Sequence, residues 1–191
     1  MSSIKLTADS GGGTFEIKAP SSSANTRVLT LPDSGDYILG GKILQVKQTV
    51  KTDVSTLSIA TTALSSDIMT VSITPQSTSS KILLQCSFCT SCSTTSVGFV
   101  FQRDSTDIGI ADAAGNRQRR TSAQTCPADT VVNINGTFLD SPSTTSAITY
   151  RVKACHTSNS TQTIVVNNNN SGDVAKFINT ICSLTAMEVA G

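Results

Sequence analysis

The stretch from Gly136 to Ala154, GTFLDSPSTTSAITYRVKA, constrains the fold more than any other part of the sequence. Apolar residues alternate with hydroxyl-bearing ones, a Ser-Pro pair interrupts the run, and the alternation then resumes. A two-residue period is that of a β-strand with one buried face, and Pro interrupts strand pairing. The stretch is therefore predicted to form a strand, a turn and a second strand, with no residue on which catalysis usually relies.

The composition indicates a β-rich, folded and weakly charged protein. The chain holds 28 serines and 28 threonines among its 191 residues, and 38% of the residues are hydrophobic. Thr has a high strand propensity, and this apolar content is too high for a disordered Ser/Thr-rich linker. Charged residues make up 14% of the chain, compared with about 25% in an average soluble domain.

The charge balance and the hydropathy pattern argue against two classes of partner. The net charge of +1 disfavours broad attraction to nucleic acid or to an anionic membrane. No apolar run approaches the roughly 20 residues that span a bilayer, so no membrane insertion is expected. The first residues, MSSIKLTADSGGG, lack the basic start and apolar core of a signal peptide, which predicts synthesis without a conventional leader.

Two segments of different character divide the chain, residues 1–41 and residues 42–191. The first contains three short strand candidates, Ile4–Ala8, Thr14–Ala19 and Arg27–Leu31, separated by Gly-rich and Ser-rich turn sequences. Strands this short cannot bury a core within one chain. We therefore predict a stem or anchor whose apolar residues pack in a trimer or against another protein. These assembly residues are Ile4, Leu6, Phe15, Ile17, Val28, Leu29 and Leu31.

Residues 42–191 carry the pattern of an antiparallel β-sandwich. Turn signals recur about every 10–15 residues, and no helical period extends beyond a turn or two. Ile43, Val46 and Val50 are the expected inward positions of the first strand, around an irregularity. A jelly-roll-like sandwich of about eight strands is the expected fold. The other strand candidates end at Pro75 or span Ser80–Cys92, Val97–Arg103, Thr130–Leu139, Ala147–Cys155, Thr161–Val166 and Phe177–Val189.

Two local expectations follow from this pattern. The strands Ser80–Cys92 and Val97–Arg103 are expected to form a hairpin pair across a polar STTS sequence. Asn135-Gly136 is the dipeptide most typical of a hairpin turn, but few strand-like residues flank it on either side. We therefore expect a bulge within one strand at this point.

The chain has six cysteines, three of which have the spacing of part of an iron–sulfur sequence, namely Cys86, Cys89 and Cys92. In a strand, however, Cys89 points away from the other two, and no fourth cysteine with its following proline lies nearby. We expect most of the six to be buried small hydrophobic residues, with one or two cross-strand disulfides as an alternative. No metal and no cofactor are expected.

Two polar clusters are the candidate contacts for a ligand outside the chain. Arg117, Arg119 and Arg120 concentrate positive charge that would bind an acidic glycan or a phosphate group bidentately. The alternative is a solvated loop or a guard against edge-strand aggregation. The second cluster is a polar loop that suits either an inert tip or an adaptable hydrogen-bonding surface for sugars. Its residues are Asn167, Asn168, Asn169 and Asn170.

Few residues offer catalytic chemistry. His156 is the only histidine, and a catalytic triad would have to use it, but no G-x-S-x-G signature accompanies it. An exposed or loosely packed His156 at a strand end is expected instead. Asp104, Asp107 and Asp112 are the candidates for glycan cleavage by carboxylates, with turn capping as the alternative. The chain is therefore not expected to be an enzyme.

Three stretches, FQRDSTDIGIADAAGNRQRRTS, GTFLDSPSTTSAITYRVKA and SLTAMEVAG, resemble a family of tailed-phage structural proteins. These are tail fibre or virion proteins that are common among marine and cyanobacterial phages. The N-terminal IKLTADSGGGTFEIKAPSSSANTRVLTLPD resembles the repeat-like stem segment of such fibres. The resemblance covers most of the chain, and FLDSPSTTSA-TY and the MEVAG ending are its more specific parts. The many cysteines depart from the family pattern.

This resemblance implies a homotrimeric appendage on the virion surface, made in the cytoplasm of a bacterial host. The N-terminal segment would bind other virion proteins of the capsid, tail or baseplate. The β-sandwich head would contribute to host attachment, with a cell-surface glycan as its partner. The alternative is a capsid decoration protein that stabilises the particle, and a glycan-cleaving spike is the third interpretation. A high copy number per virion would indicate decoration, and a low one an appendage.

Overall fold

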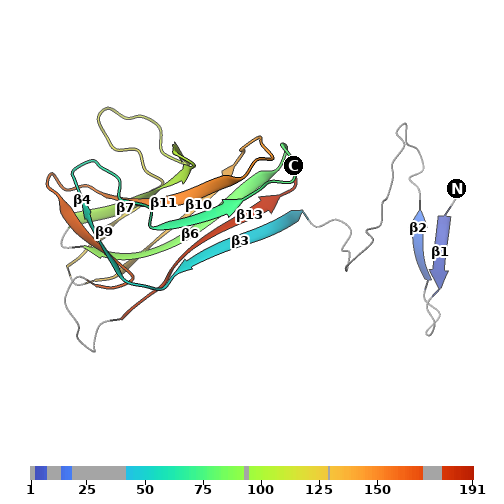
Figure 1. Ribbon diagram of the computed structural model, residues 1–191, viewed down its shortest axis with the longest axis horizontal. Coiled ribbons are helices and arrows are strands. Elements are labelled where there is room, and N and C mark those ends of the chain that lie inside the picture. The colour runs from blue at the N-terminus through green and yellow to red at the C-terminus, as the bar shows by residue number, and fades with distance from the viewer. Residues whose placement is uncertain (1–2, 8–13, 19–41, 93–94, 129, 170–177) are drawn as a thin grey trace. The chain divides into compact units, whose positions relative to one another are not determined.

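Strands are the regular elements of the computed structural model, which describes residues 3–7, 14–18, 42–92, 95–128, 130–169 and 178–191 (Figure 1). The expected all-β class is therefore confirmed. The chain divides into two compact units, Met1–Leu39 and Gly40–Gly191. Within the described ranges, no helix is long and apolar enough to cross a membrane.

The first unit contains one antiparallel strand pair, β1 (Ser3–Thr7) and β2 (Thr14–Lys18). Both strands coincide with strand candidates of the N-terminal segment. The third candidate, Arg27–Leu31, lies outside the described residues, and so do the three assembly residues expected in it. These three are Val28, Leu29 and Leu31.

The register of this pair aligns the apolar residues of the two strands. Ile4 lies opposite Ile17, and Leu6 lies opposite Phe15. The alternating pattern that the sequence shows in each strand is therefore in phase between them. All four residues belong to the predicted assembly set.

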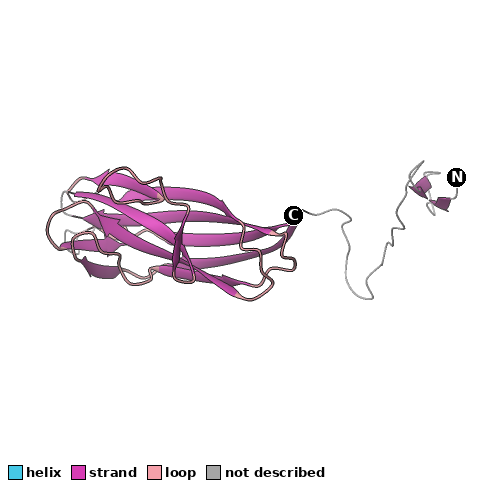
Figure 2. Cartoon of the chain, turned by 90° about the horizontal axis from the view of Figure 1, so that it is seen from above, coloured by secondary structure: helices cyan, strands magenta, loops and turns pink. Residues whose placement is uncertain are grey.

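The second unit is an antiparallel β-sandwich, as the sequence pattern predicts (Figure 2). Its strands run along the length of the sandwich, and the loops gather at the two ends. One sheet consists of β3 (Ile43–Lys51), β4 (Ser55–Ile59), β6 (Lys81–Cys92), β10 (Val132–Asp140), β12 (Gln162–Val166) and β13 (Cys182–Val189). The other consists of β5 (Met69–Ile73), β7 (Thr95–Arg103), β8 (Thr106–Ile108), β9 (Ser122–Cys126) and β11 (Ile148–His156).

Strand β6 organises the six-stranded sheet, and β7 organises the five-stranded sheet. β10 pairs along one side of β6, while β13 and β12 pair with successive parts of its other side. β11 pairs along one side of β7, while β8 and β9 share the other side. The chain alternates between the sheets from β5 through β6 to β7, and again from β10 through β11 to β12. This alternation gives the jelly-roll connectivity that was expected.

The expected hairpin between Ser80–Cys92 and Val97–Arg103 is wrong. Both strands exist as β6 and β7, but they belong to different sheets and do not pair with each other. A short polar connection is compatible both with a tight hairpin and with a crossover from one sheet to the other, so the sequence does not distinguish the two. The short strands β8 and β9 were not expected, because too few residues alternate in them to give a periodic signal.

Three phenylalanines fill the space between the two sheets. Phe88 of β6 meets Phe99 of β7 edge to face, with ring centroids 6.2 Å apart and an interplanar angle of 81°. Phe101 packs on Phe99 in a similar arrangement, with centroids 5.2 Å apart. All three rings are fully buried. Edge-to-face pairs add about 0.5–1.5 kcal/mol to the free energy of burial, so this cluster contributes strongly to the packing of one sheet on the other.

A buried polar cluster joins the two sheets at the end where Lys42 enters the sandwich. The Asp140 carboxylate of β10 accepts hydrogen bonds from Arg103 Nη1 at 3.0 Å on each oxygen. It also accepts the hydroxyl hydrogen of the fully buried Tyr150 at 2.7 Å. Burial, together with the hydrogen bond to Asp140, raises the pKa of Tyr150 far above its usual range. Breaking this cluster would leave a buried charge without compensation.

Glu188, in the C-terminal strand β13, is a second buried carboxylate. It accepts hydrogen bonds from Gln45 Nε2 at 2.6 Å and from the backbone N–H of Gln76 at 2.7 Å. Burial alone would raise its pKa, but these hydrogen bonds outweigh burial and hold the pKa of Glu188 below its usual value. The residue thereby ties β3 and the connection between β5 and β6 to β13.

The expectation for the first strand of the sandwich is half right. A register shift opposite Glu188 and Val189 confirms the irregularity in β3. However, Ile43, Val46 and Val50 do not face inward, because their side chains are 55%, 55% and 45% exposed. Apolar character led to the inward assignment, whereas the pairing of β3 with β13 directs the opposite set of residues toward the core.

The expected bulge at Asn135-Gly136 is also wrong in detail. This dipeptide does lie within one strand, as expected, but the register of β10 with β6 runs without a shift from Val132 to Asp140. The glycine has a steric reason instead of a conformational one. A Cβ atom added to Gly136 would lie 2.5 Å from Cζ of Phe99, whose ring is fully buried.

We predict that Gly136→Ala lowers the free energy of unfolding by about 1–3 kcal/mol, because the added methyl group must displace the packed Phe99 ring. Urea denaturation followed by circular dichroism measures this change. The exposed neighbour provides the matched control, since Asn135→Ala should alter the free energy by no more than about 0.5 kcal/mol. Equal effects of the two substitutions would contradict the steric explanation.

Candidate functional site

Both predicted contact clusters lie in the half of the sandwich away from Lys42. The first belongs to the connection between β8 and β9, which we call the arginine strap (residues 109–121). Its residue Thr121 donates its backbone N–H to Phe99 O at 3.0 Å, which fixes the strap against β7. The second follows β12, whose last residue, Val166, pairs with Thr90 of β6. The structure does not describe Asn170, the last residue of the second cluster.

Asn167 and Asn169 of the asparagine cluster are buried, which corrects the expectation of contact residues at these two positions. Asn167 is fully buried, and its Nδ2 donates to Lys51 O at 2.8 Å and to Asp53 O at 3.0 Å. Its Oδ1 accepts the thiol hydrogen of Cys182 at 3.0 Å. Asn169 is buried as well. Asn167 therefore anchors the turn after β3.

Asn168 is half-buried and completes this buried group. Its backbone oxygen accepts the hydroxyl hydrogen of Ser91 at 2.8 Å. Its side-chain oxygen accepts the backbone N–H of Asn169 at 2.6 Å. The hydrogen bonds of Asn167 and Asn168 thus pair backbone groups of the turns in this region, which would otherwise lack partners.

The three arginines of the strap separate into one half-buried and two exposed residues. Arg120 donates from Nη2 to Gln118 Oε1 at 2.9 Å and to Thr62 O at 3.4 Å. Arg119 is exposed and donates from Nε to Ala111 O at 2.6 Å. The Arg117 side chain is exposed. Arg120 thus ties the strap to the sandwich, whereas Arg117 and Arg119 expose their side chains.

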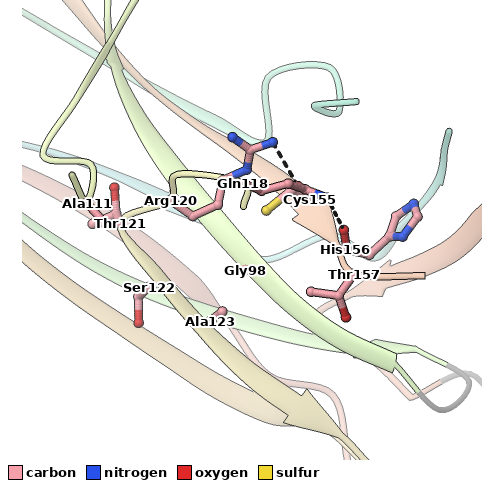
Figure 3. A pocket seen from close by; sticks show the side chains of 10 residues that line it. All are labelled: Gly98, Ala111, Gln118, Arg120, Thr121, Ser122, Ala123, Cys155, His156 and Thr157. Carbon is pink, nitrogen blue, oxygen red and sulfur yellow. Dashed lines mark hydrogen bonds between the residues drawn. The ribbon is translucent and has the colours of Figure 1, made fainter. Parts of the chain in front are cut away.

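A cavity of about 340 Å³ lies between the arginine strap and the outward face of the five-stranded sheet (Figure 3). Its floor includes Gly98 of β7 and Cys155 of β11, and the strap contributes Gln118 and Arg120. Arg120 Nε is buried there without a hydrogen-bond partner among the described residues. The cavity thus presents the Arg120 guanidinium beside the Cys155 thiol and the Gln118 amide, on walls that are otherwise mostly small or hydroxyl-bearing.

His156 lines this cavity with its backbone, while its ring joins the two sheets. The imidazole is buried, which corrects the expectation of an exposed or loosely packed residue. The backbone N–H of Ser158 donates to Nδ1 at 3.1 Å, so Nδ1 carries no proton, and Nε2–H donates to Ile59 O at 2.8 Å. Figure 3 shows the ring turned away from Arg120. Both nitrogens are occupied, and the ring has no free position for acid–base catalysis.

The three aspartates considered for glycan cleavage lie in a turn, in a strand and in the exposed part of the strap. Asp104 has a φ of 53°, and its Oδ1 accepts the backbone N–H of Thr149 at 3.0 Å. Asp107 Oδ1 accepts a hydrogen bond from Gln102 Nε2 at 2.8 Å. Asp112 lies exposed in the arginine strap. Asp104 thus ties the turn after β7 to β11, and Asp107 pairs across β7 and β8, so neither caps its own turn as the alternative expected.

All six cysteines are buried and free, in agreement with their interpretation as small hydrophobic residues. Two of them hydrogen-bond with backbone groups of β6. Cys182 Sγ accepts from Cys89 N at 3.1 Å, and Cys126 Sγ accepts from Cys92 N at 3.1 Å. Burial raises the pKa of both Cys126 and Cys182 to about 11.

The thiol next to the cavity is also held in its protonated form. Burial raises the pKa of Cys155, although the neighbouring Arg120 guanidinium opposes this rise. Across the described part of the chain, no three metal-ligating side chains converge on one point.

Comparison with known proteins adds no assignment. No protein-family model matches the chain, and no curated protein matches it. The function must therefore be argued from the residues themselves.

We predict that the native protein reacts slowly with a thiol reagent at about pH 8.5, where an ordinary cysteine is half ionised. Burial keeps all six thiols inaccessible, and it raises the pKa of four of them, Cys86, Cys126, Cys155 and Cys182, which stay protonated at this pH. Reaction with 5,5′-dithiobis(2-nitrobenzoic acid) measures this rate, and the guanidinium-denatured chain, in which all thiols react, is the control. Rapid reaction of any thiol in the native protein would contradict the prediction.

The same raised pKa values predict a loss of stability at alkaline pH. Between about pH 9 and pH 11 the unfolded chain releases thiol protons that the folded chain keeps. This ionisation stabilises the unfolded state relative to the folded state. The free energy of unfolding should therefore fall as the pH rises through this range. Urea titrations at several pH values measure this fall, and a value independent of pH would be inconsistent with buried, protonated thiols.

Proposed function

We propose that the protein is a trimeric fibre or spike subunit on the surface of a phage virion. In this proposal the N-terminal segment assembles the trimer and attaches it to other virion proteins. The β-sandwich forms the head, which contributes to attachment to the host surface. The family resemblance of the sequence supports this assignment, and so do two features of the structure.

The observation that carries the proposal is the register of the N-terminal strand pair. It aligns Ile4 with Ile17 and Leu6 with Phe15, so the apolar residues of both strands are in phase. A two-stranded sheet is at best marginally stable alone in water, and it needs a further apolar surface to pack against. Identical copies around a three-fold axis provide such surfaces and close the assembly without forming an open filament.

The arginine strap supports the second part of the proposal. Arg117 and Arg119 expose their guanidinium groups on a loop of a rigid sandwich, the usual location for recognition residues. Guanidinium groups bind carboxylate and phosphate groups bidentately, so an acidic surface glycan is a chemically suitable partner.

The assembly role is tested by light scattering coupled to size-exclusion chromatography, on the full chain and on a chain that starts at Lys42. The sandwich unit has its own hydrophobic core and is expected to fold without the N-terminal segment. We predict that the full chain is a trimer and that removal of residues 1–41 weakens trimer formation. A full chain that stays monomeric at all concentrations would refute the proposal.

The contact role is tested by replacing the exposed arginines. We predict that Arg117→Ala combined with Arg119→Ala weakens binding to an immobilised acidic polysaccharide about tenfold or more, with an unchanged melting temperature. Arg120→Ala is the contrasting variant, because it removes the hydrogen bonds to Thr62 and Gln118 and should lower the melting temperature. Unchanged binding by the double variant would exclude the strap as the contact surface.

A further inference from the structure

An apolar row crosses the outward face of the six-stranded sheet from one edge to the other. Val46 of β3 pairs with Met187 of β13, Met187 pairs with Leu83 of β6, and Leu83 pairs with Leu139 of β10. The two outer members are the most open, with Val46 at 55% and Leu139 at 51% exposure. Outward positions of a sheet that only faces water usually carry polar side chains. This row therefore calls for a physical explanation.

Exposed apolar side chains concentrate around this one sheet. Eight large hydrophobic residues are exposed within the described ranges, and each lies on this sheet or in a connection next to one of its strands. None lies on the five-stranded sheet. The eight are Ile43, Leu44, Val46, Val50, Val54, Leu139, Ile178 and Ile181. Contiguous exposed apolar surface marks an interaction site, and the row from Val46 to Leu139 is contiguous through its paired strands.

The same face is almost free of charge. Among the described outward positions of β3, β13, β6 and β10, the only charged side chain is Lys81, which donates to Ser141 Oγ at 2.7 Å. The row next to the apolar one is neutral and polar, with Gln85 opposite Thr185 and Thr185 accepting a hydrogen bond from Gln48. The five-stranded sheet differs, because its outward Arg151 and Lys153 both pair with Asp67.

We infer that this outward face of the six-stranded sheet is a self-association surface that binds a second copy of the chain. A second copy is the occupant that the charge pattern favours. Lys81 is the only charge that two copies of this face would each bring, and it already donates to Ser141, so the contact would bury few charges, whereas a charged partner would find no compensating charge there. The neutral Gln, Thr and Ser side chains beside the row can donate and accept hydrogen bonds with their own kind.

The size of the face is sufficient for such a contact. Four strands of about nine residues cover roughly 30 Å by 19 Å, or roughly 600 Å² of flat area per copy. Side chains make the accessible area larger than the flat area, which brings it near the roughly 800 Å² per partner of a standard protein interface. Isolated surface leucines would not provide this continuity.

The position of the face also fits the proposed function. The inference depends on that function only for the number of copies in the assembly. β3 starts directly after Lys42, where the N-terminal segment joins the sandwich, and β3 carries four of the eight exposed residues. β3 and β10 form opposite edges of this part of the sheet. In a ring of three, each copy can turn this face toward the three-fold axis, so that the Val46 side of one face packs on the Leu139 side of the next and the ring closes.

The test combines Val46→Lys with Leu139→Lys in the full chain and in the chain that starts at Lys42. Both positions are more than half exposed, so the folded monomer should tolerate lysine, as the melting temperature will show. We expect the double variant to raise the dissociation constant for self-association about a hundredfold or more, because each contact would bury new charges. Light scattering over a range of protein concentrations measures this constant.

The matched control places the same charges on edge strands of the other sheet, as Thr70→Lys combined with Gln124→Lys, and should leave self-association unchanged. If both double variants associate like the natural chain, the inference is overturned, while a persisting full-length trimer would leave the proposed function standing. If the Val46/Leu139 variant alone dissociates a dimer, the face is supported and the trimer is refuted. If all chains are monomeric, both are refuted.

Discussion

The contact between Phe88 and Phe99 is the interaction on which the rest of the sandwich depends. These rings belong to the central strands of opposite sheets, and their edge-to-face packing sets how the sheets lie on each other. Gly136 of β10 has no side chain, and the Phe99 ring occupies the space that a side chain there would need. Once this layer is in place, one face of every strand is committed to the core. The other residues of each strand, at alternate positions, then form the outward faces of the two sheets.

Polar bridges between the sheets close the sandwich at both ends of this aromatic layer. At the end near Lys42, Asp140 of one sheet holds Arg103 and Tyr150 of the other. At the opposite end, the His156 ring reaches across to Ile59 O. These groups are fully paired, so they rigidify the sandwich and are not free for chemistry. A stable scaffold with loops at its far end suits the proposed attachment role.

The two outward faces differ in a way that suggests a division of roles. The five-stranded sheet carries ion-paired side chains and the arginine strap, which are compatible with exposure to solvent and to a charged ligand. The six-stranded sheet carries an uncharged face crossed by an apolar row. Assembly through one face would leave the other accessible. The proposed head would then use one sheet for its own copies and the other for contacts outside the particle.

The sequence by itself determined most of the longer strands, because a two-residue alternation of apolar and polar side chains is a local property that survives into the fold. It predicted the all-β class, the irregularity in β3 and the burial of the cysteines. Only the tertiary structure decided which strands pair, so β6 and β7 proved to belong to different sheets. It also decided which side of β3 faces out, and whether Arg120, Asn167 and His156 are exposed. The physical reason is that burial and pairing depend on residues distant in the chain, which no local pattern encodes.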